Sequence, residues 1–151
     1  MTVSLRAAVA SDQSAIRVCA EEAYAVYVPQ IGRRPAPMDA DFAAQIAANQ
    51  IRVATGRRGR VIGYAVFCPD KDAMHLESLA VRPSAAGQGV GKALMDLCEV
   101  EARALGPKAV RLYTNAAMIR NLQIYRHLGY VETHRRFQAG FDRVYFEKRL
   151  T

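Results

Sequence analysis

Three glycines alternate at the start of a predicted helix and could hold a phosphate group. Gly87, Gly89 and Gly91 follow an apolar strand that ends at Val81 and a chain break at Pro83. Glycine leaves the backbone uncovered, and the first N–H groups of a helix have no partner inside the helix. Because the helix dipole is positive at this end, such a turn is suited to an anion, most often a phosphate.

Two common phosphate-binding motifs do not fit this turn. A Walker loop needs Gly, four residues and Gly-Lys-Ser/Thr, but Ala86 and Ala93 occupy the first glycine and the hydroxyl position. A dinucleotide fingerprint needs a third glycine where Lys92 stands and an acidic residue about 20 residues further on. Residues 107–111 offer no acidic residue. The turn is therefore a poor match to an NTPase or to a Rossmann enzyme.

The turn and the strand before it resemble the coenzyme A-binding motif of the GCN5-related N-acetyltransferases, the GNAT superfamily. That motif reads Arg/Gln-x-x-Gly-x-Gly/Ala after a strand ending in Ala-Val-x-Pro, and residues 80–83, Gly89 and Gly91 match it. Ala86 stands where the family has arginine or glutamine, so backbone N–H groups would carry the pyrophosphate and we expect weaker binding. The resemblance implies an acetyl-CoA site, whose residues in this region would be Leu79, Ala80, Val81, Gly87, Gln88, Gly89, Val90, Gly91 and Lys92.

A second segment, residues 114–130, resembles the family's later helix, which closes with Tyr-x-x-x-Gly-Phe/Tyr. We expect Asn115 to cap this helix at its start and Gly129 at its end. Asn121 and Tyr125 are four residues apart and share one helix face. The resemblance implies that both bind the cofactor, that Asn121 holds the pantetheine arm or orients the acceptor, and that Tyr125 protonates the departing thiolate. Tyr125 as a core aromatic residue is the alternative.

Acetyl transfer to an amine also needs a base and a group that polarises the thioester carbonyl. By the same resemblance, a backbone N–H near Val81 polarises the carbonyl. His75, Glu77, Leu79 and Val81 alternate to one strand face, and a carboxylate among apolar neighbours is costly unless it is paired or functional. We expect Glu77 to be the base, directly or through water. The alternatives are an ion pair at Glu77, catalysis by His75, and an amine that needs no dedicated base.

The acceptor site in the family comes from the connection between the first two helices, here residues 24–38. We expect Tyr24, Tyr27 and Arg33 to bind the acceptor. Arg33 or Arg34 could pair with an acceptor carboxylate, which would indicate small amines bearing an acid group or peptide ends. A rigid loop without a binding role is the alternative.

The composition predicts one ordinary globular domain over residues 1–151, with 51% hydrophobic and 23% charged residues. No apolar run approaches the roughly 20 residues that cross a bilayer, and the N-terminus lacks the apolar stretch of a secretory leader. We therefore expect a cytoplasmic protein without membrane contact. Cys19, Cys68 and Cys98 form no Cys-x-x-Cys pair and do not cluster with the histidines, so we expect buried thiols and no metal site.

The net charge of +7 raises the question of a nucleic-acid partner. The arginines are dispersed, without a recognition helix or an aromatic-interleaved motif, so we expect a basic surface that attracts coenzyme A or acidic acceptors and no specific nucleic acid. The expected partner is a small-molecule or peptide amine, and a homodimer is a possible assembly. Two other functions remain open: a non-catalytic acyl-CoA sensor, and a nucleic-acid-binding module whose glycine turn binds a backbone phosphate.

The order of the predicted elements favours an α/β (α+β) fold with a mixed, mostly antiparallel sheet of about seven strands and four helices on both faces. The family has the same order, and its fourth and fifth strands splay to admit the pantetheine arm. We expect Ser11-Asp12 to cap the first helix, whose buried face reaches Val26, and the helix after the glycines to bury Leu105. The strands are expected at residues 3–9, 51–54, 61–67, 74–81, 109–114, about 130–137 and 143–150.

Overall fold

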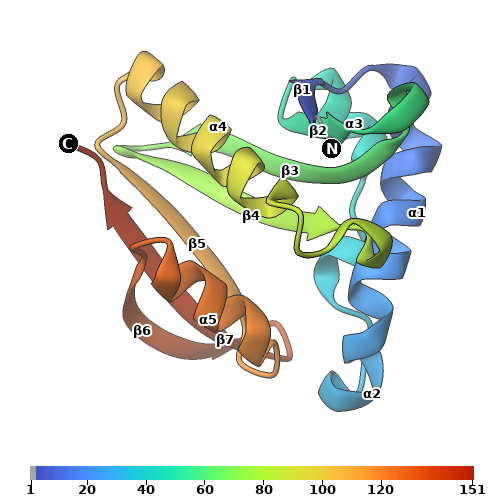
Figure 1. The fold of residues 1–151 in the computed structure, drawn as a ribbon. Helices are drawn as coiled ribbons and strands as arrows, with labels where there is room; N and C mark the ends of the chain where they lie inside the picture. The colour runs from blue at the N-terminus through green and yellow to red at the C-terminus, as the bar shows by residue number, and fades with distance from the viewer. Residues whose placement is uncertain (1–2) are drawn as a thin grey trace. The chain divides into compact units, whose positions relative to one another are not determined.

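The structure is a computed structural model that describes residues 3–151. Its strands are β1 (Ser4–Ala7), β2 (Ile51–Thr55), β3 (Val61–Asp70), β4 (Ala73–Val81), β5 (Ala109–Asn115), β6 (Val131–Gln138) and β7 (Phe141–Arg149). Its helices are α1 (Gln13–Tyr24), α2 (Val28–Ile31), α3 (Phe42–Ala47), α4 (Val90–Leu105) and α5 (Ile119–His127) (Figure 1). Four of these helices were expected, and α2 adds a single turn within the predicted loop.

One sheet of seven strands has the order β1-β2-β3-β4-β5-β7-β6. The pairs β1–β2, β2–β3, β5–β7 and β6–β7 are antiparallel, and β4 and β5 are parallel. The predicted mixed, mostly antiparallel sheet is therefore confirmed. The parallel register joins Ala73–Leu76 of β4 to Ala109–Leu112 of β5.

The chain forms two compact units, each assembled from two separate stretches. The first unit contains residues up to Phe67 together with Ser78–Leu97, and the second contains Cys68–Glu77 and Cys98–Thr151. As a result, β3, β4 and α4 each begin in one unit and end in the other. The single domain over residues 1–151 stays a prediction.

In the first unit, α1 buries one face and α3 adds an aromatic side chain. Ile16 and Cys19 are fully buried, and the Phe42 ring meets the Tyr64 ring edge-on at 5.7 Å between centroids. The expected burial of Val26 is wrong, because α1 ends at Tyr24 and the chain continues as a 3-10 turn with a different period. Val26 is 62% exposed there.

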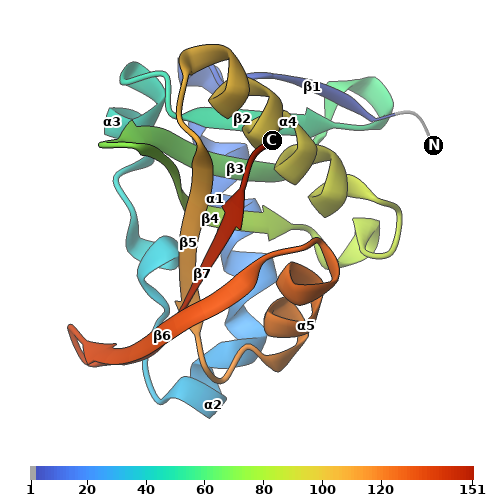
Figure 2. The same ribbon diagram turned by 90° about the vertical axis from the view of Figure 1, so that its left-hand side faces the viewer.

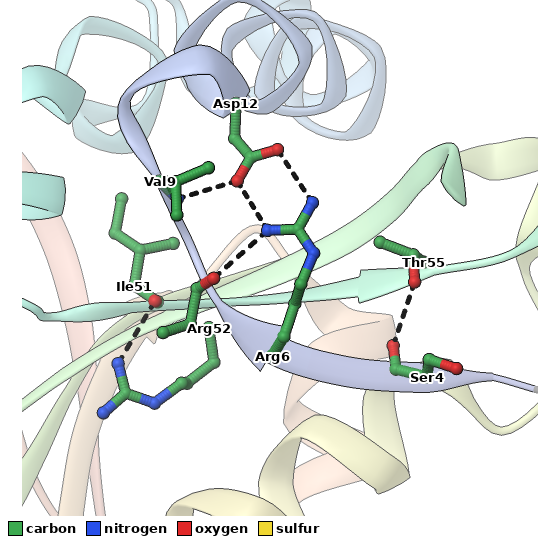
Figure 3. Close-up of polar contacts among 8 residues, drawn as sticks. Ser4, Arg6, Val9, Asp12, Ile51, Arg52 and Thr55 are labelled. Atoms are coloured by element: carbon green, nitrogen blue, oxygen red, sulfur yellow. Dashed lines mark hydrogen bonds and ion pairs between the residues drawn. The ribbon is translucent and has the colours of Figure 1, made fainter. Parts of the chain in front are cut away.

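The start of α1 is tied to β1 by an ion pair (Figure 3). The Asp12 carboxylate accepts hydrogen bonds from Arg6 Nη1 at 2.7 Å and from the Val9 backbone N–H at 2.8 Å. It caps a short 3-10 turn over Ala10–Asp12 and makes no side-chain cap to α1, which corrects the expected role of Ser11-Asp12. The hydrogen bond from Arg6 is the main reason why the pKa of Asp12 lies below its usual range.

In the second unit, α5 packs beside β6 and β7 (Figure 2). Tyr125 contacts the Phe146 ring of β7 at 5.9 Å between centroids. Gly129 ends α5 in the left-handed region, where the Tyr130 N–H bonds the Tyr125 carbonyl and the Gly129 N–H bonds the Arg126 carbonyl. This Schellman motif confirms the predicted cap at Gly129.

Two sequence expectations in the second unit are wrong. Asn115 ends β5 and does not cap α5, because its side chain accepts the Ala117 N–H at 2.8 Å in a local turn and Met118 becomes the first capping residue. Leu105 is 64% exposed, because it lies in the last turn of α4, after the buried positions Cys98 and Ala102.

Candidate active site

The glycine turn of the first unit presents an exposed backbone. Gly87 and Gly89 have φ of +78° and +81°, a region that other L-residues rarely adopt. Apart from its two chain neighbours, no residue within 3–151 has a heavy atom within 4 Å of the position where either glycine would carry a Cβ. A ligand can therefore approach this backbone closely.

The start of α4 supplies N–H groups at the same turn. The Ala93 N–H bonds the Gly89 carbonyl at 3.0 Å, so the N–H groups of Val90, Gly91 and Lys92 precede the first bond of the helix. The Val90 side chain is buried and anchors the turn. The Lys92 ammonium pairs with Asp96 at 2.7 Å. These backbone donors and the open space fit the pyrophosphate of coenzyme A, and this fit does not need the side chain that Ala86 lacks.

The last residues of β4 are held by a tyrosine from α1. The Tyr24 hydroxyl donates a hydrogen bond to the Leu79 carbonyl at 2.8 Å, and Tyr24 is only 5% exposed. The structure thus places this predicted acceptor residue in the core of the first unit. Leu79 and Val81 point to the half-exposed strand face, and Ala80 points to the buried one.

A buried arginine, which the sequence analysis did not single out, fixes the chain between β4 and the turn. Arg82 is 6% exposed, and its Nε donates to the Val61 carbonyl at 2.8 Å while its Nη1 pairs with Glu22 at 3.0 Å. Its backbone N–H donates to the Ile62 carbonyl at 2.8 Å. Nothing in the sequence pattern distinguishes this arginine from a solvated one.

Gly63 is a second positioning residue that the sequence analysis missed. An ideal Cβ at Gly63 would lie 3.0 Å from the Ala80 carbonyl oxygen and 3.0 Å from Cγ1 of Val90. The chain therefore needs glycine where β3 passes the end of β4 and the start of α4. A glycine inside a strand often marks such a close approach, and this signal was available in the sequence.

The second unit holds the two predicted residues of α5. Tyr125 is 6% exposed, and burial is the main reason why its pKa is raised above the usual phenol range. Its hydroxyl is protonated at neutral pH, as that of an unshifted tyrosine also is. Asn121 is half-buried one turn earlier and donates from Nδ2 to the Met118 sulfur at 3.6 Å.

The first half of β4, also in the second unit, carries the predicted base. His75 is half-buried and Glu77 is exposed, while Leu76 and Ser78 point to the buried side. The predicted alternation along β4 is therefore confirmed. Burial, with smaller contributions from the charges of Glu77 and Asp70, raises the pKa of the Cys68 thiol.

The connection after α1 carries the remaining predicted acceptor residues. Tyr27 is half-buried and Arg33 is exposed. Arg34 is held by two carboxylates, with Nη2 at 2.6 Å from Glu21 and Nε at 3.0 Å from Asp39. Its charge is therefore already matched by one carboxylate of α1 and by one just after the connection.

Other kinds of site find little support in residues 3–151. No group of three histidine, cysteine or acidic side chains in this range could hold a metal ion. None of the helices described there has the length and apolar character to span a membrane. The three cysteines are free thiols, and burial raises the pKa of Cys19 and of Cys98 to about 12. These two thiols are therefore unreactive at neutral pH.

Solved structures of acetyltransferases share this fold. The PaiA N-acetyltransferase of Thermoplasma acidophilum, in complex with coenzyme A, superposes with a TM-score of 0.83 at 17% identity over 99% of both chains. The ribosomal-protein-S18-alanine N-acetyltransferase of Escherichia coli superposes with a TM-score of 0.76 at 19% identity, over 99% of this chain and 95% of that one. Ard1 of Thermoplasma volcanium superposes with a TM-score of 0.77 at 17% identity, over 100% of this chain and 99% of that one.

No curated protein sequence matches the chain significantly. At the identities above, the structural likeness shows the fold alone. The sequence model of the acetyltransferase (GNAT) family, however, matches residues 18–130, which include the glycine turn and both predicted residues of α5. Because this match spans most of the 151 residues, the chain belongs to the acetyltransferase (GNAT) family.

Proposed function

We propose that this protein transfers the acetyl group of acetyl-CoA to a primary amine, by direct attack of the amine in a ternary complex. Membership of the family supports the reaction class. The glycine turn carries the proposal of acetyl-CoA as the donor, because its uncovered backbone and open space suit a phosphate. When bound, acetyl-CoA would supply an acetyl group that is activated as a thioester.

In this proposal the first unit binds the donor. The N–H groups of residues 87–92 bind the pyrophosphate, and backbone groups of Leu79, Ala80 and Val81 bind the pantetheine arm. The Val81 N–H polarises the thioester carbonyl. Tyr24 and Arg82 act indirectly, because their hydrogen bonds to the Leu79 and Val61 carbonyls fix β4 and the turn.

Tyr125 is proposed as the general acid. A phenol is protonated at neutral pH, so a proton is available for the thiolate that leaves, and the raised pKa of this buried hydroxyl makes it a weaker acid than an exposed tyrosine. The ring is fixed against Phe146 and Tyr130, which limits the directions that the hydroxyl can take. Asn121, one turn earlier, would bind the pantetheine arm or orient the acceptor.

Glu77 is proposed as the base that removes the proton of the amine. Its exposed position on β4 lets it act through water as well as directly. Glu77→Gln should lower the rate most at low pH, where the amine needs most help to lose its proton. A pH profile identical to the native one would leave His75 or a water as the base.

The acceptor would approach Tyr27 and Arg33 in the connection after α1. The contacts of Tyr24 and Arg34 make them structural residues in this proposal, since one hydroxyl is bonded in the core and one guanidinium holds two carboxylates. Arg33→Ala should raise the acceptor KM and leave the affinity for acetyl-CoA unchanged.

Release of free coenzyme A from acetyl-CoA, measured with a thiol reagent against a panel of amines, tests the proposal. Catalytic amounts of protein keep the signal of the half-buried Cys68 negligible. Amine-dependent release, together with thermal stabilisation by acetyl-CoA, would support acetyl transfer. Stabilisation without release from any amine would indicate an acyl-CoA sensor, and no stabilisation would contradict the donor site.

A further inference from the structure

Four aromatic rings cross the second unit on the sheet face opposite α5. Neighbouring centroids lie 5.8 Å apart for His75–Tyr113, 5.3 Å for Tyr113–Tyr145 and 4.2 Å for Tyr145–His134. The rings come from β4, β5, β7 and β6, with the last pair stacked at 10°. We call these four side chains the aromatic row.

Two arginines lie opposite each other at one edge of this row. Arg136 of β6 and Arg143 of β7 are register partners, and like charges at directly opposed positions destabilise a sheet. The Arg143 guanidinium lies over the Tyr113 ring at 4.3 Å and donates to Gln138 Oε1 at 3.4 Å. Arg143 is therefore held in place by neutral groups, although its like-charged partner is adjacent.

No carboxylate neutralises this arginine pair. Among residues 3–151, neither Arg136 nor Arg143 has an acidic partner within ion-pair distance. Arg111, on the same strand face, differs, because it contacts both Asp72 and Glu147 at 3.0 Å. The pair thus keeps two positive charges available, one of them pre-positioned.

A cavity of about 470 Å³ lies against the same row. All four rings of the row line it, together with charged side chains that include Asp70 and Arg149. Its size and its aromatic walls suit the body of a small organic molecule. The two arginines lie next to this lining without being part of it, because Arg143 lies over the ring of Tyr113 and Arg136 follows His134 on the same strand face.

We propose that the Arg136–Arg143 pair binds a carboxylate or phosphate of the amine acceptor, whose apolar body occupies the cavity beside the aromatic row. The acceptor class would then be an amine that carries an acidic group, and this pair would bind that group in place of Arg33. The role of this ligand as the acceptor rests on the proposed acetyl transfer, whereas anion binding at the arginine pair does not depend on it. An oxyanion would relieve the repulsion between the two arginines and form charge-assisted hydrogen bonds with both.

Binding to the full chain without acetyl-CoA tests the site directly. Isothermal titration at low ionic strength would use benzoate and phenylphosphate as probes and benzamide as the uncharged counterpart. Arg136→Gln and Arg143→Gln should each lower the affinity for the two anions about tenfold. Arg103→Gln, which removes an exposed arginine from the last turn of α4, should leave their affinity unchanged.

Tyr113 provides a matched pair of variants. Tyr113→Phe keeps the ring beneath Arg143 and should bind the anions with the native affinity. Tyr113→Leu removes the ring and should lower this affinity. Equal binding of benzamide and benzoate would overturn the proposal. Equal affinities in the native chain and in both glutamine variants, or the same loss in Arg103→Gln, would also overturn it.

Turnover gives an independent readout. The native chain should prefer 4-(aminomethyl)benzoate to benzylamine in kcat/KM, and Arg143→Gln should remove this preference by raising KM for the acid alone. The KM for acetyl-CoA should not change. If no amine is acetylated, the proposal of acetyl transfer fails, while the anion titrations still decide the arginine site. If the anions do not bind, thermal stabilisation by acetyl-CoA is unaffected and only the arginine site fails.

Discussion

Gly63 offers a stringent test of how the glycine turn is positioned. In Gly63→Ala the new methyl carbon would lie 3.0 Å from the Ala80 carbonyl oxygen, 3.0 Å from Val90 Cγ1 and 3.4 Å from Leu94 Cδ1. Both 3.0 Å contacts are shorter than ordinary van der Waals separations. Since the carbonyl belongs to the backbone, it cannot move aside by rotating a side chain, and β3, the end of β4 or the start of α4 must shift.

The expected cost follows from this geometry. Extra methyl groups in a packed core typically cost about 1–3 kcal/mol. Because one of the two close neighbours is backbone, we expect the upper part of that range, roughly 2–3 kcal/mol. For a domain of this size, 1 kcal/mol lowers Tm by about 2–4 °C, so Gly63→Ala should melt roughly 4–12 °C lower. Its affinity for acetyl-CoA should also fall, because α4 begins at the displaced Val90.

Urea unfolding and thermal melting of a matched set would measure this cost. Gly91→Ala is the control, because its Cβ would lie 3.7 Å from Val81 Cγ2, an ordinary contact, and alanine is the better helix former. It should be neutral or stabilising. In the Val90→Ala background, Gly63→Ala should cost less, since one of the two close contacts is removed. A Gly63→Ala protein as stable as the native one would refute the packing argument.

Three further predictions concern the turn, the acid and the ion pair. Gly89→Val should lower the affinity for acetyl-CoA about tenfold or more in titration calorimetry, because a φ of +81° is strained for valine and its side chain covers the N–H groups that bind the phosphate. Unchanged affinity in a folded variant would contradict the site. Tyr125→Phe should lower kcat by about 10²–10⁴ while acetyl-CoA binding persists, and a native kcat where chemistry limits turnover would make the ring structural. Asp12→Asn should lower the free energy of unfolding at neutral pH, because the depressed pKa of Asp12 means that its ion pair stabilises the fold when ionised. This difference should vanish in urea titrations as pH falls through the lowered pKa; a difference that persists in acid would show that the loss is not electrostatic.

The strongest local signals in the sequence predicted most of the fold. Alternation along β4 and helical spacing from Leu94 to Ala102 depend on burial of one face, and the structure buries those faces. Gly129 was predictable because a left-handed residue after a helix favours glycine. The errors at Val26 and Leu105 arose at helix ends, where the period changes or the core stops.

The parts of the site that escaped prediction depend on contacts between distant segments. Tyr24 meets the carbonyl of Leu79 and Arg82 meets that of Val61, and no local pattern encodes either bond. Asn115 was misassigned because its side chain can cap either a helix or a local turn. The register of β6 also could not be foreseen, since it shifts between Glu132 and His134 and thereby brings His134 opposite Tyr145.

The interleaved path of the chain has a consequence for its synthesis on the ribosome. Neither unit is a continuous segment, so the first 67 residues cannot complete their unit until residues 78–97 have been made. Residues 68–77 must likewise wait for β5, their parallel partner. The nascent chain therefore carries β4 with the edge that pairs with β5 still open while more than 30 further residues are added, a period in which exposed strand edges are prone to aggregate.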